Sequence, residues 1–423
     1  DCPLRHRRRG SGVGGTPILE ISERDGKLTR RRFPKGCYTV HVRQPRPVMN
    51  DYRKDFADFG ETTFLDCATQ GPFPHTTALR VREAIELKCH PYRLESQEYF
   101  ALPRRVRTLL ARLIGAQPEE IALTNSATHG LSVVANGLGL GPGDEVVTTA
   151  VNFPANLLTW LHLRKRGVEV KILNPERGFP TPEEVAAALT SRTRVVALDY
   201  VSFRNGCKID IEAISEARAG RDTLLVVDAT QAVGALPINV DSFPVDAFAC
   251  AGYKWLLGPY GAGFAFLRRR FQDRLSPTVL NWMSVEGASK FHKLPGEDFK
   301  PARDASRFDV PETANFLNLY ALESSLEFLH RVGVENIMRH CFGLLDRLRE
   351  ALASRGFQLN ASAEPAHRST ILTFRASSEE DTARMHQKLS DQQVIVSLRE
   401  GWIRVSPHLY NSEEDMDRLI ATL

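Results

Sequence analysis

The sequence lacks several features that would assign it to a membrane-bound or disulfide-rich class. No apolar run approaches the about 20 residues that a membrane-spanning helix needs, so we expect no membrane partner. The seven cysteines are odd in number and dispersed, and no two of them form a CxxC pair. This pattern disfavours a disulfide framework or a zinc site and favours a reducing, cytoplasmic compartment. Internal repeats are also absent.

Acidic residues are scarce in residues 1–50. This segment carries twelve Lys or Arg against four Asp or Glu, whereas the whole chain of 423 residues has a formal net charge of +4. Glycine and proline interrupt the segment, and its apolar residues show little periodicity. We expect a basic, disordered or loosely attached tail. Such a tail could bind nucleic acid or an anionic surface, but a merely solvated tail is the simpler interpretation, so we expect no nucleic-acid partner.

The tail also contains the stretch TRRRFPK at residues 29–35, which resembles a twin-arginine export signal. Such a signal continues into an apolar segment of roughly 7–15 residues. The residues that follow here, GCYTVHVRQPRPV, include a histidine, two arginines and two prolines. We therefore interpret the stretch as coincidental and keep the expectation of a cytoplasmic protein.

The rest of the chain is of ordinary globular composition, with 42% hydrophobic and 25% charged residues, and is long enough to bury a large core. From about residue 105, short apolar runs alternate with helical patterns. Alternating buried strands and helices predict an α/β fold with a mostly parallel central sheet flanked by helices. The predicted strands are EIALT (120–124), EVVTTA (145–150), VEVKIL (168–173), RVVALDYV (194–201), TLLVVDA (223–229), DAFACAG (246–252) and GAGFAFL (261–267).

The pattern changes after about residue 315. Two long helical segments, 317–333 and 334–356, precede a mixed region of short strands and helices that ends with a helix at 413–423. This order is typical of an α+β unit. We therefore predict a large α/β domain at 51–315 and a smaller C-terminal α+β domain at 316–423.

Two residues at predicted strand ends carry a distinctive chemistry. Ligands of open α/β sheets bind at the carboxyl ends of the strands. Asp228 directly follows the apolar run LLVV, and Lys254 follows FACAGY. An enzyme that uses pyridoxal 5'-phosphate (PLP) needs this pair, because the lysine forms a Schiff base and the carboxylate keeps the pyridine nitrogen protonated. A helix cap for Asp228 and a surface charge for Lys254 are the plain alternatives, but the small and apolar neighbours of Lys254 make a poor surface.

The segment TNSATHG, residues 124–130, links a predicted strand to a predicted helix. Small and hydroxyl residues at a helix N-terminus leave backbone N–H groups free for a phosphate, and the helix dipole favours an anion. A plain capping turn would look the same. Together with Asp228 and Lys254, the segment predicts a cradle for the 5'-phosphate, with N–H donors at Ala127 and Thr128 and a hydroxyl at Thr128.

With these residues in place, the sequence resembles the class V aminotransferase family over roughly residues 60–423. This family of fold-type I PLP enzymes includes cysteine desulfurases, kynureninases and isopenicillin N epimerase-like proteins. The motifs that carry the resemblance, in order, are FLDCATQGPFP, TNSATHG, VVDATQAVGALP, AGYKWLLGPYGAGF, RFDVPETANF and IRVSPHLYNSEED.

The resemblance implies a role for each matching residue. Lys254 would hold the cofactor and Asp228 would pair with its ring nitrogen. The other implied cofactor contacts are Gln231 at the phenolic oxygen, Tyr253 at the phosphate, Phe153 stacked on the ring, and Thr313 at the phosphate of a neighbouring subunit. Arg404 would grip the carboxylate of an amino-acid substrate, although an exposed strand charge is the alternative. The family also implies a homodimer with shared active sites.

Three departures from the desulfurase pattern matter. No cysteine follows Cys341, so the loop nucleophile of desulfurases is missing. Phe203 replaces an asparagine near the cofactor, and Phe153 replaces the stacking histidine. These departures favour the epimerase-like and kynureninase-like branches over cysteine desulfuration.

The leading interpretation is a PLP-dependent aminotransferase that acts on an amino acid. A lyase or an epimerase, of the isopenicillin N epimerase or selenocysteine lyase type, stays open because the cofactor residues are shared among these reactions. A third hypothesis is a non-catalytic binding protein on the same fold. Lys254 and Asp228 argue against it, because a binding protein has no chemical need of both.

Overall fold

The computed structural model describes residues 22–24, 27–29, 52–290 and 298–423. The chain divides into two units, residues 1–49 and 50–423. In the first unit, β1 (Ser22–Arg24) and β2 (Lys27–Thr29) form an antiparallel hairpin. The remainder of the basic tail, including most of the twin-arginine-like stretch, lies outside the described residues. No helix of the described part is long and apolar enough to cross a membrane.

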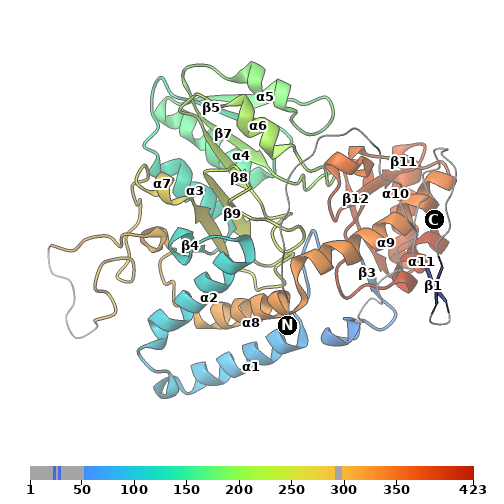
Figure 1. Cartoon of the computed structure of the whole chain (residues 1–423), viewed down its shortest axis with the longest axis horizontal. Helices are drawn as coiled ribbons and strands as arrows, with labels where there is room; N and C mark the ends of the chain where they lie inside the picture. The colour runs from blue at the N-terminus through green and yellow to red at the C-terminus, as the bar shows by residue number, and fades with distance from the viewer. Residues whose placement is uncertain (1–21, 25–26, 30–51, 291–297) are drawn as a thin grey trace. The chain divides into compact units, whose positions relative to one another are not determined.

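A seven-stranded sheet forms the centre of the second unit (Figure 1). Its spatial order is β4-β10-β9-β8-β7-β5-β6, and among these seven strands β10 alone runs in the opposite direction to the other six. The sequence prediction of a mostly parallel sheet is therefore confirmed, and each predicted run contains one strand. The strands are β4 (Ile121–Thr124), β5 (Glu145–Thr149), β6 (Glu169–Leu173), β7 (Thr193–Asp199), β8 (Leu224–Asp228), β9 (Ala247–Ala251) and β10 (Gly263–Leu267).

Helices cover both faces of this sheet, and they bury most of its strand residues. On one face, α3, α4 and α7 pack on side chains such as Val226 and Ala249. On the other face, α2, α5, α6 and α8 pack on side chains such as Leu225 and Val227, and α1 lies along α8. The helices are α1 (His75–Cys89), α2 (Glu98–Ile114), α3 (Ala127–Gly137), α4 (Pro154–Leu161), α5 (Pro182–Ala188), α6 (Ile211–Ala217), α7 (Arg269–Gln272) and α8 (Phe316–Val332).

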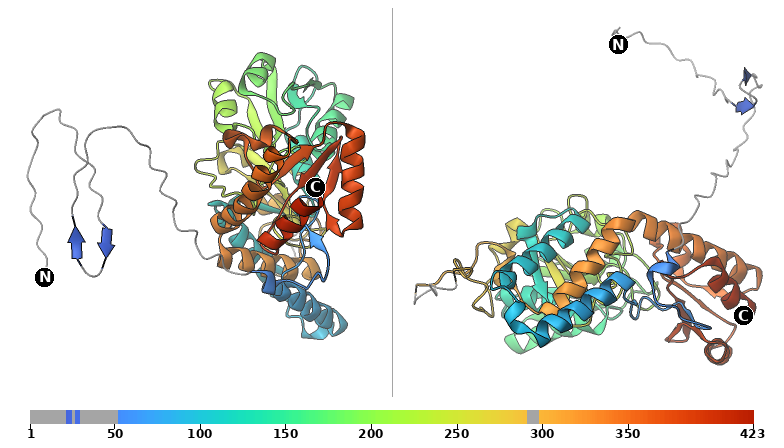
Figure 2. Two further views of the ribbon diagram at one scale, coloured as in Figure 1. Left: turned by 90° about the vertical axis from the view of Figure 1, so that its right-hand side faces the viewer. Right: turned by 90° about the horizontal axis from the view of Figure 1, so that it is seen from below.

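The C-terminal region forms an antiparallel sheet in the order β11-β12-β15-β14, with helices packed against it (Figure 2). This arrangement confirms the predicted α+β character. The elements are α9 (Val334–Ser354), β11 (Gln358–Leu359), β12 (Leu372–Arg375), α10 (Glu379–Asp391), β13 (Val394–Ile395), β14 (Ser397–Arg399), β15 (Trp402–Val405) and α11 (Glu413–Thr422).

The N-terminal segment of the second unit also contributes to this region. The strand β3 (Thr63–Phe64) pairs in parallel with β13, and Leu65 packs in the same hydrophobic cluster as α9 and β15. Because residues 50–423 form one compact unit, the predicted domain boundary between residues 315 and 316 stays a prediction.

Candidate active site

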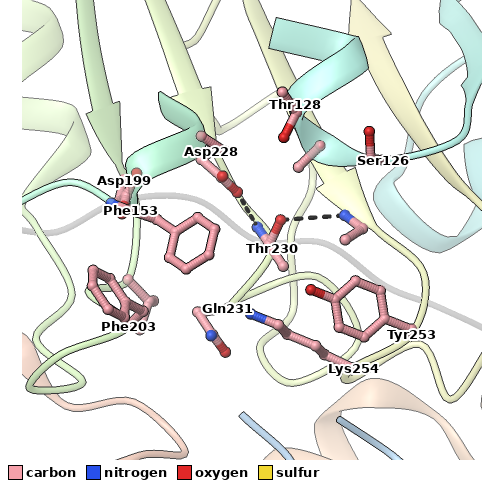
Figure 3. A pocket seen from close by; sticks show the side chains of 14 residues that line it. Ser126, Thr128, Phe153, Asp199, Phe203, Asp228, Thr230, Gln231, Tyr253 and Lys254 are labelled. Carbon is pink, nitrogen blue, oxygen red and sulfur yellow. Dashed lines mark hydrogen bonds between the residues drawn. The ribbon is translucent and has the colours of Figure 1, made fainter. Parts of the chain in front are cut away.

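A pocket with an empty volume of about 470 Å³ opens at the carboxyl ends of β7, β8 and β9 (Figure 3). The side chains come from five separate stretches of the chain, as expected where parallel strands end at one edge of a sheet. The lining residues are Ser126, Ala127, Thr128, Phe153, Ala155, Asp199, Val201, Phe203, Asp228, Thr230, Gln231, Ala251, Tyr253 and Lys254.

Asp228 is the last residue of β8, and its carboxylate is buried at the wall of the pocket. The N–H of Thr230 donates to Oδ1 at 2.9 Å, and no regular helix follows, so Asp228 is not a helix cap. Burial raises the pKa of Asp228, while the Thr230 hydrogen bonds and the Lys254 charge lower it. A nearby cation would favour its ionised form, which is what a protonated ring nitrogen would supply.

Lys254 is 6% exposed and lies on the turn after β9. Burial lowers the pKa of its amine most strongly, Asp228 raises it, and Arg404 lowers it further. The amine is therefore more often neutral near neutral pH than a surface lysine, as a nucleophilic lysine requires. Its Nζ lies 5.3 Å from the centre of the Phe153 ring.

The turn that carries Lys254 is tightly constrained. Leu257 has a φ of 54°, a left-handed conformation that a bulky residue rarely adopts. Gly71 donates its N–H to the carbonyl of Tyr253 at 2.9 Å. At Gly234, where φ is +89°, a Cβ would lie 2.7 Å from the carbonyl oxygen of Trp255. The fold thus holds the lysine backbone from two sides.

The predicted phosphate cradle is the N-terminus of α3. Ser126 caps this helix by accepting the His129 N–H at 3.1 Å, so the helix begins at Ala127, inside the segment 124–130 that was predicted to precede it. Ala127 and Thr128 line the pocket in the first turn, and Tyr253 lies on the same wall. The aromatic ring of Tyr253 stacks on Tyr260, with 4.2 Å between the ring centres.

Gln231 is fixed by contacts at both ends of its amide. Nε2 donates to the carbonyl of Ala68 at 2.9 Å, and Oε1 accepts the indole N–H of Trp255 at 2.8 Å. The side chain still lines the pocket, and Nε2 has a second hydrogen to donate. It can therefore reach an oxygen of a bound ring, as the resemblance implies.

Two aromatic rings form the wall opposite Lys254. Phe153 precedes α4, and Phe203 follows β7. The rings meet edge to face, with 5.0 Å between their centres and an interplanar angle of 86°. Phe153 is 37% exposed, which leaves part of its face open for a stacked ring.

Arg404 and Thr313 do not line this pocket. Arg404 lies on β15 and is only 2% exposed, which excludes the alternative of an exposed strand charge. Its guanidinium donates to Asp66 Oδ1 at 2.9 Å, to Thr69 Oγ1 at 2.7 Å and to the carbonyl of Phe203 at 2.7 Å. Thr313 is buried, and its hydroxyl donates to the carbonyl of Val310 at 2.7 Å. The roles predicted for both residues stay predictions.

Sequence reasoning missed Asp199 and Asp66. Asp199 ends the apolar run of β7 in the same way as Asp228 ends that of β8, so the strand-end rule could have found it. Asp66 had no such signal, because its partner Arg404 lies 338 residues away.

No cysteine is among the described residues that line the pocket. Cys67, Cys207, Cys250 and Cys341 are fully buried, and burial raises the pKa of each thiol. Cys89 is exposed on α1. The described residues also hold no group of three or more side chains suited to a metal ion.

The residues present fit PLP. A basic amine, a buried carboxylate, a capped helix N-terminus and an aromatic wall surround one pocket, and these groups match an aldehyde, a ring nitrogen, a phosphate and a flat ring. Together with the mostly parallel sheet and the smaller C-terminal unit, they define a fold-type I PLP-dependent enzyme.

Comparison with known proteins gives the family. The model of the family "Aminotransferase class-V" matches residues 92–419, and the chain belongs to this PLP-dependent family. An uncharacterized aminotransferase, YcbU of Bacillus subtilis, is 31% identical over 74% of this chain and 81% of its own length. A probable cysteine desulfurase of Methanothermobacter thermautotrophicus is 27% identical over 88% and 96%, and the isopenicillin N epimerase of Streptomyces clavuligerus is 26% identical over 85% and 93%.

Solved structures agree on the fold. The apo cysteine desulfurase of Thermococcus onnurineus NA1 has a TM-score of 0.76 at 23% identity, covering 88% of this chain and 96% of its own. The cystine C–S lyase C-DES, in complex with cysteine persulfide, has a TM-score of 0.76 at 22% identity, covering 85% and 96%.

Proposed function

We propose that this protein is a PLP-dependent aminotransferase that acts on an α-amino acid and uses Lys254 as its single proton carrier. One observation carries the proposal: Lys254 is the one basic side chain among the described residues that line the pocket. Transamination moves a proton between two carbon atoms that are joined through one nitrogen, on one side of the cofactor, and one mobile amine is sufficient for that transfer.

Bound PLP supplies an electron sink for the carbanion formed at the substrate α-carbon. The residues of this chain do the remaining work. Lys254 attaches the cofactor and then accepts and returns the proton at Nζ. Asp228 holds a proton on the ring nitrogen, the N-terminus of α3 binds the phosphate, and Phe153 with Phe203 excludes water from the opposite wall.

That opposite wall bears on the choice among the reactions that the sequence left open. Phe153, Phe203, Ala155 and Val201 are apolar and carry no group that could protonate a carbanion. An epimerase that uses a base on each face would need such a group, so epimerisation is less well supported than a one-base reaction.

A lyase is the second candidate, because elimination also needs only one base. Relatives named as probable cysteine desulfurases support it. Sulfur transfer by a protein thiol is not part of this proposal, since no cysteine is among the described residues that line the pocket. A non-catalytic binding role would leave the buried Lys254 and Asp228 without a purpose.

For the substrate we propose an α-amino acid whose carboxylate is bound by Arg404. In this structure the Arg404 guanidinium donates hydrogen bonds to Asp66 and to the carbonyl of Phe203. Because Arg404 is 2% exposed, the loop at Phe203 has to move before a substrate carboxylate can reach it.

We also propose a cytoplasmic homodimer with shared active sites, in which Thr313 reaches the phosphate of the neighbouring subunit. Large apolar side chains are exposed on α1, on the turn that follows it and on residues between 279 and 317, and a second copy would cover them. These residues are Leu79, Ile85, Tyr92, Val279, Leu280, Trp282, Phe299 and Leu317.

A panel of L- and D-amino acids tests the reaction type. The PLP-loaded enzyme is incubated with each amino acid without a keto-acid acceptor, and the cofactor spectrum, ammonia and enantiomer ratio are followed. We expect one equivalent of keto acid and complete conversion of the cofactor to its amine form. Repeated release of ammonia would indicate the lyase instead, and appearance of the opposite enantiomer would indicate an epimerase.

A further inference from the structure

A second carboxylate, Asp199, shares the pocket with Asp228. The two residues end neighbouring parallel strands and are direct register partners. Such partners lie about 4.8 Å apart and point to the same face of a sheet. Both side chains are buried and line the pocket (Figure 3).

The surroundings of Asp199 hold it in one place. Its Oδ2 accepts the Phe153 N–H at 2.6 Å, and its Oδ1 accepts Nδ2 of Asn156 at 3.0 Å. Asn156 is itself fixed, because its Oδ1 accepts the indole N–H of Trp160 at 3.0 Å. Both oxygens of Asp199 thus accept from N–H donors, an arrangement that suits a carboxylate rather than a carboxylic acid.

Helix α4 adds to this stabilisation. Phe153 is the residue before the helix and provides no side-chain cap of its own. Asp199 supplies the missing acceptor from β7, next to the positive end of the helix dipole. Asp199 therefore caps α4, but capping alone does not require its side chain to face the pocket.

Two buried carboxylates at adjacent strand ends repel each other. Burial raises the pKa of Asp199 well above its usual value, and the Asp228 charge raises it further. Among the described lining residues, Lys254 is the only cation that offsets them. When its amine is used to attach the cofactor, that charge is no longer free, and the pair needs another positive charge.

We propose that Asp199 and Asp228 form a carboxylate pair that holds the protonated ring nitrogen of the cofactor, with Asp199 acting as a positioning residue that adds a second negative charge. The hydrogen bond that Asp199 accepts from the Phe153 N–H also fixes the backbone of Phe153, and with it the position of the ring. The inference rests on the proposed function only through the cofactor and not on the reaction type.

Reconstitution with PLP labelled with ¹⁵N at the ring nitrogen tests the pair. The ¹⁵N chemical shift is followed against pH in the wild type and in the variants Asp199→Asn and Asp199→Ser, both of which keep an acceptor for the Phe153 N–H. Loss of one charge within hydrogen-bonding range shifts a pKa by about 1–3 units. We therefore expect the ring nitrogen to lose its proton about 1–3 pH units lower in both variants.

Two controls separate charge from structure. Asp210→Asn removes a carboxylate that caps α6 away from the pocket, and it should leave the ¹⁵N profile unchanged. Phe153→Leu removes the stacking ring and should weaken PLP binding, measured by fluorescence titration, without shifting the profile. An unchanged profile in the two Asp199 variants would show that Asp199 is a helix cap only.

A measurement on the wild type covers the case in which the Asp199 variants do not fold. The infrared difference spectrum between the PLP-loaded and PLP-free protein should show no gain of a carboxylic-acid band on cofactor binding. A gain would mean that the pair takes up a proton rather than holding a cation, and it would overturn the proposal. Labelled PLP that fails to bind the wild type would instead contradict the proposed cofactor site.

Discussion

Gly71→Ala offers a direct test of how the fold positions Lys254. A Cβ at residue 71 would lie 2.7 Å from Cδ2 of Leu257 and closer still to the carbonyl oxygen of Lys254. The side chain of Leu257 could give way, but the carbonyl belongs to the backbone of the cofactor lysine. The variant therefore has to displace that backbone or the segment at Gly71.

Crowding of this kind in a packed region costs about 1–3 kcal/mol of stability. Because the hydrogen bond from the Gly71 N–H to the carbonyl of Tyr253 lies at the same place, the displacement should also move the Lys254 amine. We expect a lower urea midpoint and slower covalent attachment of PLP, which borohydride reduction followed by mass spectrometry measures.

Gly141→Ala is the matched control. No heavy atom lies within 4 Å of a Cβ placed at Gly141, and its φ is not left-handed. Its stability should stay within about 0.5 kcal/mol of the wild type. If Gly71→Ala matched this control in stability and in PLP attachment, the idea that Gly71 holds the lysine turn would be wrong.

Four further outcomes follow from the site. Lys254→Ala should abolish the borohydride-reducible link to PLP and the pH-dependent yellow band; a link that persists would refute the assignment. Asp228→Asn should still bind PLP but turn over poorly, as a substrate assay with fluorescence titration of the cofactor would show, and near-wild-type turnover would refute its role. Light scattering should detect a dimer, and a monomer that is fully active when dilute would contradict the shared site. With L-cysteine, sulfide and alanine should be formed slowly or not at all; fast catalytic alanine release would place the protein among the desulfurases.

The sequence predicted the central sheet well because of how its strands are buried. Strands that are covered on both faces read as continuous apolar runs, so each of the seven could be recognised locally. Asp228 and Lys254 stand out for the same reason, since polar residues directly after such runs are conspicuous. Residues 124–130 were predicted to link a strand to a helix, but α3 begins inside this segment at Ala127, because Ser126 caps small residues that resemble a loop in the sequence.

Long-range partners could not be predicted in this way. The burial of Arg404 depends on Asp66, and nothing in the local sequence around either residue indicates the other. The pairing of β3 with β13 joins residues 63 and 394 and is equally invisible to local patterns. Asp199 was open to prediction, but its contact with the Phe153 N–H depends on how α4 crosses back over β7.

The pairing of β3 with β13 also limits how this protein can be recombined. In the C-terminal region, β13 pairs with Thr63–Phe64, and Leu65 packs in the hydrophobic cluster of that region. Asp66 also forms an ion pair with Arg404 and neutralises its buried charge. A chimera that exchanged only the residues after 316 with a relative would separate these partners. Such a chimera should therefore take residues 63–66 from the same donor as the C-terminal segment. The donor's arginine is then paired with the donor's own aspartate.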